Sequence, residues 1–149
     1  LEQLYTFGKP DRDPRERVIT IAYYALIPSD RLQLRAATDA DAVGWFGLDE
    51  MPTLAFDHED IFAMAHQRLA AKLEYSTIAF QFLPEEFTLS QLQAVYETIQ
   101  RAPLDKRNFR KWVLALEQIE ESGGERREGA HRPAKLYRVI SPGTVAIIK

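Results

Sequence analysis

Two short amphipathic patterns follow each other closely in the last third of the chain. Their apolar residues recur at i, i+3, i+4 and i+7, at Leu92, Val95, Tyr96 and Ile99 and again at Phe109, Trp112, Val113 and Leu116. Ser90 and Gln93 have the spacing of a capping box at the start of the first pattern. The sequence "RAPL" interrupts the periodicity, and Asp105 is the next candidate N-cap. We therefore predict two short helices joined by a tight connection.

Beyond these helices the pattern indicates a β-hairpin. The segments "QIEES" and "AKLYRVI" have strand character, and a charged, glycine-rich loop from Gly123 to Gly129 separates them. The basic residues predicted on this hairpin and its tip are Arg126, Arg127, Arg132 and Lys135. Helix, helix, hairpin is the order of elements in a winged helix-turn-helix domain.

The first third of the chain has a different pattern. Alternating or continuously apolar stretches predict strands at 1–7, 16–27 and 42–52, with a loop at 8–17. The second of these stretches, "ERVITIAYYALI", is almost entirely apolar from Ile19 onward, which predicts a strand buried on both faces. Because three short strands do not close a core alone, we expect part of a mixed α/β domain whose remainder lies upstream.

A longer helix is predicted between these two regions. Asp57 is its candidate N-cap, and Glu59 and Asp60 lie in its first turn, where the helix dipole favours carboxylates. Its apolar face consists of Ile61, Ala65, Leu69 and Leu73. We place the domain boundary here, so that 1–56 forms the first domain and 57–149 the second, with 57–75 as a connector helix.

Acidic and basic residues are distributed unevenly along the chain. Residues 1–100 contain 8 Lys and Arg against 16 Asp and Glu, a net charge of −8. Residues 101–149 contain 11 Lys and Arg against 6 Asp and Glu, a net charge of +5. A basic segment that follows an acidic one is typical of a chain whose basic part binds a polyanion.

The start of the second predicted helix concentrates this charge. In a winged helix-turn-helix the N-terminal part of that helix enters the DNA major groove, and its C-terminal part belongs to the core. Arginine can donate two hydrogen bonds to guanine, asparagine can pair with adenine in the same way, and lysine more often neutralises phosphate. We predict base contacts from Arg107, Asn108 and Arg110, and backbone contacts from Lys106, Lys111, Arg132 and Lys135. The alternative is a solvated face on an ordinary helix pair.

Other chemistry has less support in the sequence. There is no cysteine, which excludes disulfides and Cys-ligated zinc and suits a reducing cytoplasm. His58 and His66 stand eight residues apart without a third ligand, so we expect no metal site. No apolar run approaches the roughly 20 residues of a membrane span, and no signal peptide is visible. We expect a cytoplasmic protein that does not enter a membrane.

Several longer segments resemble a known family. "RLAAKLEYSTIAFQFLPEEFTLSQLQAVYE", "LDKRNFRK" and "HRPAKLYR" are similar to the Nudix-related transcriptional regulators of bacteria, of the NrtR-like type. "LYTFGKPDRDPRERVITIAYYALI" resembles the latter part of their N-terminal Nudix-like domain. The resemblance implies an α+β chain, in which a partial Nudix-like mixed α/β region precedes a winged helix-turn-helix domain. It also implies a dimeric repressor of operons for NAD or related metabolism, with ADP-ribose as the effector and double-stranded DNA as the partner.

The resemblance places the loop between the first two strands at the border of the effector pocket. Guanidinium groups suit a pyrophosphate because they bind phosphate with two parallel hydrogen bonds. We therefore expect Arg12, Asp13 and Arg15 to bind the effector. The alternative is a solvated loop with internal ion pairs to Asp11, Asp13 and Glu16.

A hydrolytic Nudix domain requires the pattern G-x5-E-x7-R-E-U-x-E-E-x-G-U, where U is aliphatic, because its glutamates hold Mg²⁺. The segment "LEQIEESG" imitates it only in part. Leu116 stands where arginine is required, and Asn108 and Ala102 occupy the upstream glutamate and glycine positions. We expect a helix end and a strand there, and no enzymatic activity or cofactor in this chain.

One alternative function remains, a fragment of an ADP-ribose pyrophosphatase whose winged helix serves dimerisation. A helix used only for dimerisation would not be expected to expose Lys106, Arg107, Arg110 and Lys111 together.

Overall fold

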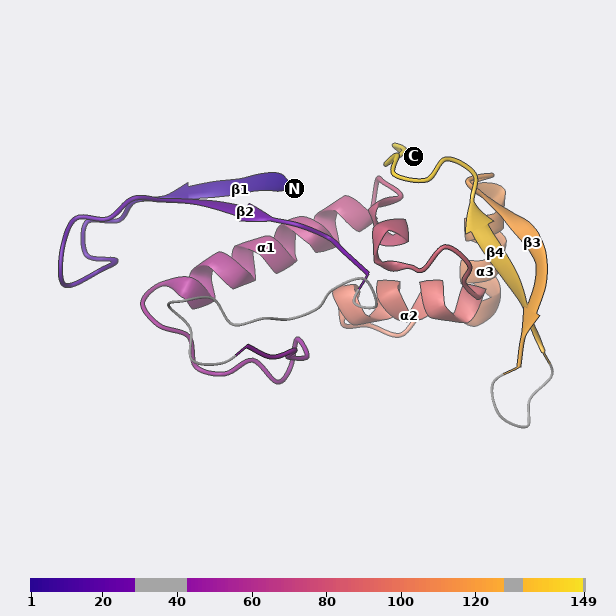
Figure 1. The fold of residues 1–149 in the computed structure, drawn as a ribbon, viewed down its shortest axis with the longest axis horizontal. Coiled ribbons are helices and arrows are strands. Elements are labelled where there is room, and N and C mark those ends of the chain that lie inside the picture. The colour runs from indigo at the N-terminus through magenta and orange to yellow at the C-terminus, as the bar shows by residue number, and fades with distance from the viewer. Residues whose placement is uncertain (29–42, 128–132, 149) are drawn as a thin grey trace. The chain divides into compact units, whose positions relative to one another are not determined.

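The computed structural model describes residues 1–28, 43–127 and 133–148, which form two compact units, Leu1–Gln67 and Arg68–Lys149. The elements, in order, are β1 (Glu2–Phe7), β2 (Thr20–Tyr24), α1 (His58–Leu73), the 3₁₀ helix η2 (Ile78–Phe82), α2 (Leu89–Gln100), α3 (Lys106–Ala115), β3 (Ile119–Arg126) and β4 (Ala134–Val139) (Figure 1). The predicted α+β class is confirmed. Within the described ranges, no helix has the length and apolar character needed to cross a membrane.

The first unit contains an antiparallel hairpin of β1 and β2. Glu2 pairs with Tyr24 and Phe7 with Thr20, and the register shifts between Gln3 and Tyr5. The predicted strand in 16–27 is therefore present but shorter, and the prediction that it is buried on both faces was wrong. Ile21 and Tyr23 are more than half exposed. Apolar content predicts burial only if a second layer covers the strand, and in the part of the chain described here β2 pairs with β1 alone.

The strand predicted at 42–52 is also wrong, because none of residues 43–52 lies in a strand. The amide of Glu50 donates to the carbonyl of Gly47 at 3.0 Å, which closes a turn in the middle of the segment. Trp45 and Phe46 are more than half exposed. Aromatic and β-branched residues favour a strand only where a neighbouring strand can pair with them.

The helix predicted to follow Asp57 is present as α1. Asp57 stands immediately before it, and the amide of Ile61 donates to the Asp57 carbonyl at 3.2 Å. Glu59 and Asp60 occupy the first turn and Lys72 the last, so both ends carry the charge that the helix dipole favours.

Helix α2 begins two residues earlier than predicted, because its N-cap is Thr88 and not Ser90. The capping box is formed by Thr88 and Gln91, not by Ser90 and Gln93. The Thr88 hydroxyl accepts from the Gln91 amide at 3.2 Å, and the Gln91 side chain accepts from the Thr88 amide at 2.8 Å. The sequence contains two possible capping boxes, Thr88 with Gln91 and Ser90 with Gln93, whose first residues are two positions apart. The earlier one brings Leu89 into the helix, where it is buried.

Helix α3 follows the prediction closely. Asp105 is its N-cap, because its side chain accepts from the Asn108 amide at 2.8 Å. Phe109 and Val113 are buried. The ring of Tyr96 on α2 meets the rings of Phe109 and Trp112 edge to face, with centroid distances of 5.4 Å in both cases. This aromatic contact packs α3 against α2.

The predicted hairpin is present, but β3 extends through the first part of the expected loop (Figure 1). Gly123 adopts φ +85°, and the β3–β4 register shifts between Glu121 and Glu125. A Cβ on Gly124 would approach the Leu136 side chain to 3.1 Å. The glycines therefore allow an irregular strand that passes close to its partner, instead of starting the loop.

The end of the chain pairs with the segment that follows α1. The Ile148 amide donates to the Tyr75 carbonyl at 2.8 Å, and the Thr77 amide donates to the Ala146 carbonyl at 3.0 Å. The Thr77 hydroxyl in turn accepts from the Ala146 amide at 2.9 Å. Thr77 and Ile148 are both buried. Residues 146–148 thus form a short strand-like contact within the second unit.

This contact predicts a stability effect. Replacing Thr77 by valine keeps the shape of the side chain but removes the hydroxyl acceptor. We expect the free energy of unfolding to fall by about 1–3 kcal/mol, because the Ala146 amide loses its partner. Urea unfolding measures this change. The control is Thr98→Val on the exposed side of α2, which should change the free energy by less than about 0.5 kcal/mol. Equal urea midpoints for Thr77→Val and Thr98→Val would contradict the role given to the Thr77 hydroxyl.

Candidate nucleic-acid interface

The first turn of α3 presents the predicted polar residues. Lys106, Arg107, Asn108 and Lys111 are all exposed, whereas Phe109 is buried. The Asp105 cap fixes where the helix starts, and the buried Phe109 fixes which side faces the core. The structure therefore brings four of the seven predicted DNA-binding residues together at one helix end.

A hydrogen-bonded network holds the turn before α3. The Glu97 carboxylate accepts from the Leu104 amide at 2.8 Å and from the Gln93 side chain at 2.9 Å, and Gln93 also donates to the Leu104 carbonyl at 2.9 Å. The Leu104 amide, followed by the Gln93 amide group, lowers the pKa of Glu97. Sequence reasoning missed Glu97 and assigned Gln93 to a capping box, although the i, i+4 spacing of the two residues on α2 was a visible signal.

Tyr96 shows how tightly the two helices pack. Burial raises the pKa of its hydroxyl to about 12, because the phenolate would lose its hydration. Trp112 lies across the same contact and remains 38% exposed. The aromatic contact therefore lies immediately beside the exposed polar residues of α3.

Arg110 differs from its neighbours. Its side chain is half-buried, and its Nη2 lies 3.5 Å from the hydroxyl of Ser90 on α2. Its Nε is enclosed and has no hydrogen-bond partner among the described residues. The guanidinium thus lies against the first turn of α2 instead of extending with Arg107.

The hairpin carries the remaining predicted residues. Lys135 is exposed on β4, and its Nζ lies 2.7 and 2.9 Å from the two carboxylate oxygens of Glu121. This pairing raises the pKa of Lys135. Arg126 donates to the side chain of Gln91 at 3.3 Å. Arg132 lies outside the described residues.

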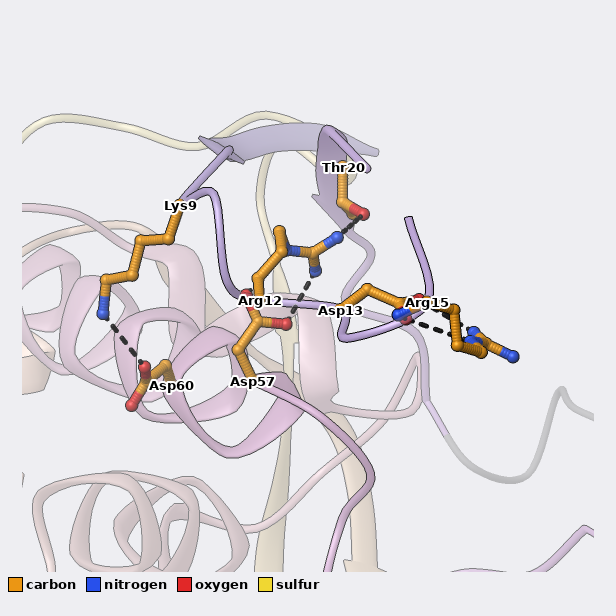
Figure 2. Close-up of polar contacts among 7 residues, drawn as sticks. All are labelled: Lys9, Arg12, Asp13, Arg15, Thr20, Asp57 and Asp60. Atoms are coloured by element: carbon orange, nitrogen blue, oxygen red, sulfur yellow. Dashed lines mark hydrogen bonds and ion pairs between the residues drawn. The ribbon is translucent and has the colours of Figure 1, made fainter. Parts of the chain in front are cut away.

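In the first unit, the loop between β1 and β2 contains the predicted effector residues. Figure 2 shows Arg12 directed at Asp57, the residue before α1. Its Nε and Nη2 donate to the two carboxylate oxygens at 2.8 and 2.7 Å, and its Nη1 donates to the Thr20 hydroxyl at 2.7 Å. The Arg12 side chain is only 5% exposed. The bidentate pair lowers the pKa of Asp57 and raises that of Arg12.

Asp13 and Arg15 form a second, more exposed pair (Figure 2). The Arg15 guanidinium donates to both carboxylate oxygens at 3.0 and 2.8 Å, and its own amide also donates to Asp13 at 3.0 Å. These hydrogen bonds lower the pKa of Asp13 to about 2. Arg15 also lies over the ring of Phe56, with 4.9 Å from its Cζ to the centroid. Of the internal ion pairs expected for a solvated loop, the one with Asp13 is present.

Among the residues that the structure describes, no three or more histidine or carboxylate side chains are grouped so that they could hold a metal ion.

Comparisons with known proteins match both parts of the chain. Residues 79–139 match the family described as the NrtR DNA-binding winged helix domain. The chain is 35% identical over 140 residues to an ADPR responsive transcriptional repressor, NtrR, of Acinetobacter baylyi, covering 93% of this chain and 55% of that protein. An ADP-ribose pyrophosphatase of Methanocaldococcus jannaschii is 41% identical over 58 residues, covering 39% of this chain and 33% of that protein.

A solved structure is also similar to most of the chain. The structure of Shewanella oneidensis NrtR complexed with a 27mer DNA superposes with a TM-score of 0.78 at 37% identity, covering 93% of this chain and 63% of that one. The chain thus spans 55–63% of the length of these two relatives.

The Asp13–Arg15 pair predicts a titration. The folded pKa of about 2 lies below the ordinary aspartate value of about 3.9. The pair is therefore complete above about pH 4, and its contribution to stability is lost as the pH falls toward 2. Carboxyl-carbon NMR should show this midpoint in the wild-type chain and a midpoint near the ordinary value in Arg15→Ala. Arg17→Ala, which removes an arginine from the same loop, should leave it unchanged. An ordinary Asp13 midpoint in the wild-type chain would refute the pairing.

Proposed function

The chain belongs to the NrtR family of Nudix-related transcriptional regulators, and on that premise we propose that it binds operator DNA as part of a repressor that responds to ADP-ribose. The observation that carries the proposal is the exposed polar start of α3, inside the region that matches the winged helix domain. Its similarity to a structure complexed with DNA supports the same function.

In this proposal α3 enters the major groove with its first turn. Arg107 and Asn108 contact base edges, because both are exposed at the helix end. Arginine donates to the two acceptors of guanine, and asparagine pairs with one donor and one acceptor of adenine. Lys106 and Lys111 neutralise phosphates on either side. Lys135 contacts the flanking backbone after its ion pair with Glu121 opens, and Arg132, which lies outside the described residues, is proposed to contact the backbone as well.

The effector is assigned to the first part of the chain. Residues 1–56 act as the C-terminal part of a Nudix-like sensing domain, and residues 57–149 act as the DNA-binding domain. Arg15 contacts the pyrophosphate of ADP-ribose, because it is exposed and its guanidinium rests on an aromatic ring. Arg12 and Asp13 contribute by holding the loop in place.

The relatives also suggest the biological setting. We propose that the complete protein works in the cytoplasm as a homodimer and controls genes of NAD or related metabolism. An ADPR responsive repressor among the relatives supports control by a metabolite of NAD.

A second candidate function is favoured by the match to an ADP-ribose pyrophosphatase. In that case the winged helix serves dimerisation and the protein hydrolyses ADP-ribose. The segment "LEQIEESG" lacks the arginine and upstream glutamate of the hydrolytic pattern, and the structure places it at the end of α3 and the start of β3. Release of AMP from ADP-ribose with Mg²⁺ by this chain would favour the second function, whereas salt-dependent binding of a DNA duplex would favour the first.

The first test of the proposed function is DNA binding as a function of salt. Each phosphate contact releases a counterion, so six or more contacts should weaken binding by about 10³-fold or more between 50 and 200 mM salt. Fluorescence anisotropy with a labelled duplex measures the dissociation constant across this range. Absence of binding at 50 mM salt, or binding that does not depend on salt, would refute the proposal.

The second test separates base contacts from backbone contacts. Arg107→Ala should cost about 1–3 kcal/mol on a duplex selected from a random pool by the wild-type chain, and much less on a scrambled duplex. Lys111→Ala serves as the matched comparison, because it removes one exposed charge from the same helix. It should weaken both duplexes alike and lower the salt slope by about one unit. If Arg107→Ala weakens both duplexes equally, the base contact is wrongly assigned.

A further inference from the structure

The structure separates Arg110 from the other cations of α3. Lys106, Arg107 and Lys111 are exposed, but Arg110 is half-buried with its Nε enclosed. Its nearest polar contact is the Ser90 hydroxyl in the first turn of α2. A guanidinium held in this position lies against the first turn of α2, and it is poorly placed to reach a base edge together with Arg107.

The hydrogen bonds of Arg110 are far from satisfied. A guanidinium has five N–H donors. The described residues offer it one hydroxyl oxygen at 3.5 Å, the outer limit of a hydrogen bond, and nothing for its Nε. Ser90 is exposed, so its hydroxyl can donate to an incoming group while it accepts from Arg110.

The surrounding charge points to an anion as the missing partner. Other arginines of the chain pair with a carboxylate, as Arg12 does with Asp57 and Arg138 with Glu120. Arg110 has a hydroxyl instead. The next residue of the same turn, Gln91, accepts from Arg126 of β3, so a second cation lies at this turn. The first turn of α2 contains no acidic residue.

We propose, building on the assignment of DNA binding, that Ser90 and Arg110 together bind one phosphate of the DNA backbone. Arginine and serine are both common donors to backbone phosphates, and the first helix of a helix-turn-helix crosses the backbone. The phosphate accepts from the Arg110 guanidinium and from the Ser90 hydroxyl. Arg110 is therefore a backbone contact that sets the register of α3 on the duplex, and base contacts are left to Arg107 and Asn108.

The test compares Arg110→Ala, Ser90→Ala and the double variant on the selected and the scrambled duplex. Arg110→Ala should weaken binding to both by a similar factor, about tenfold, and lower the slope of log K against log salt by about 0.9. Ser90→Ala should weaken both about two- to fivefold, and should have little further effect in the Arg110→Ala background, because the two residues share one ligand. Arg17→Ala removes the same charge from the first unit and should leave the slope unchanged.

One further variant, an unfolding measurement and a duplex with a neutral linkage exclude a purely structural role. Arg110→Lys keeps the charge and should restore most of the salt slope. Thermal unfolding of each variant shows whether the fold is retained. A duplex with a single methylphosphonate, scanned along the site, should contain one position at which Arg110→Ala no longer weakens binding.

The outcomes are distinct. If the wild-type chain binds neither duplex, the assignment of DNA binding fails and this inference fails with it. If the wild-type chain binds with a steep salt slope but Arg110→Ala weakens only the selected duplex, Arg110 contacts a base and the phosphate site is wrong. If Ser90→Ala and Arg110→Ala are strictly additive, the two residues do not share a phosphate.

Discussion

The position of α3 depends on one small network at the end of α2. The Glu97 carboxylate and the Gln93 amide together satisfy both backbone groups of Leu104, and this fixes the turn of residues 101–105. Asp105 then caps α3 at a defined residue. Because a helix rotates its side chains by about 100° per residue, a shift of the start by one residue would turn Arg107 and Asn108 away from the surface that they now share.

The same constraint explains why the polar residues gather at the front of α3. Phe109 and Val113 must face α2, where Phe109 meets Tyr96. The first turn extends beyond this contact and is free to carry charge, whereas the rest of the helix is committed to the core on one side. The start of α3 is thus exposed, and the residues after it pack one side of the helix against α2. Arg110 lies where these two parts meet.

Local patterns in the sequence were sufficient for the second unit. Both helices, the Asp105 cap and the hairpin follow from spacing. The polar residues predicted at the start of α3 are exposed except for Arg110, which is half-buried. The capping box was misplaced because Thr88–Gln91 and Ser90–Gln93 offer the same chemistry two residues apart, and only burial of Leu89 selects between them. The hairpin glycines were taken for a loop because their role in an irregular strand depends on how closely Leu136 approaches.

The first unit was harder to predict for a different reason. Its apolar stretches indicate strands, but whether a strand forms and which face is buried depend on partners distant in the sequence. In the part of the chain that the structure describes, no strand pairs with residues 43–52, and β2 pairs with β1 alone. The pairing of Arg12 with Asp57 spans 45 residues, so the loop sequence alone suggested a ligand contact where the structure has an internal ion pair.

The central claim is that the first turn of α3 faces the DNA. Amide chemical-shift mapping of the ¹⁵N-labelled chain with a selected duplex at low salt tests it most directly. We predict the largest shifts at Lys106–Lys111 and at Ser90, smaller shifts along β3 and β4, and almost none in β1 and β2. Heparin, a polyanion without base pairs, should not reproduce the pattern at Arg107 and Asn108. Shifts confined to other elements, or an identical pattern with heparin, would contradict the account.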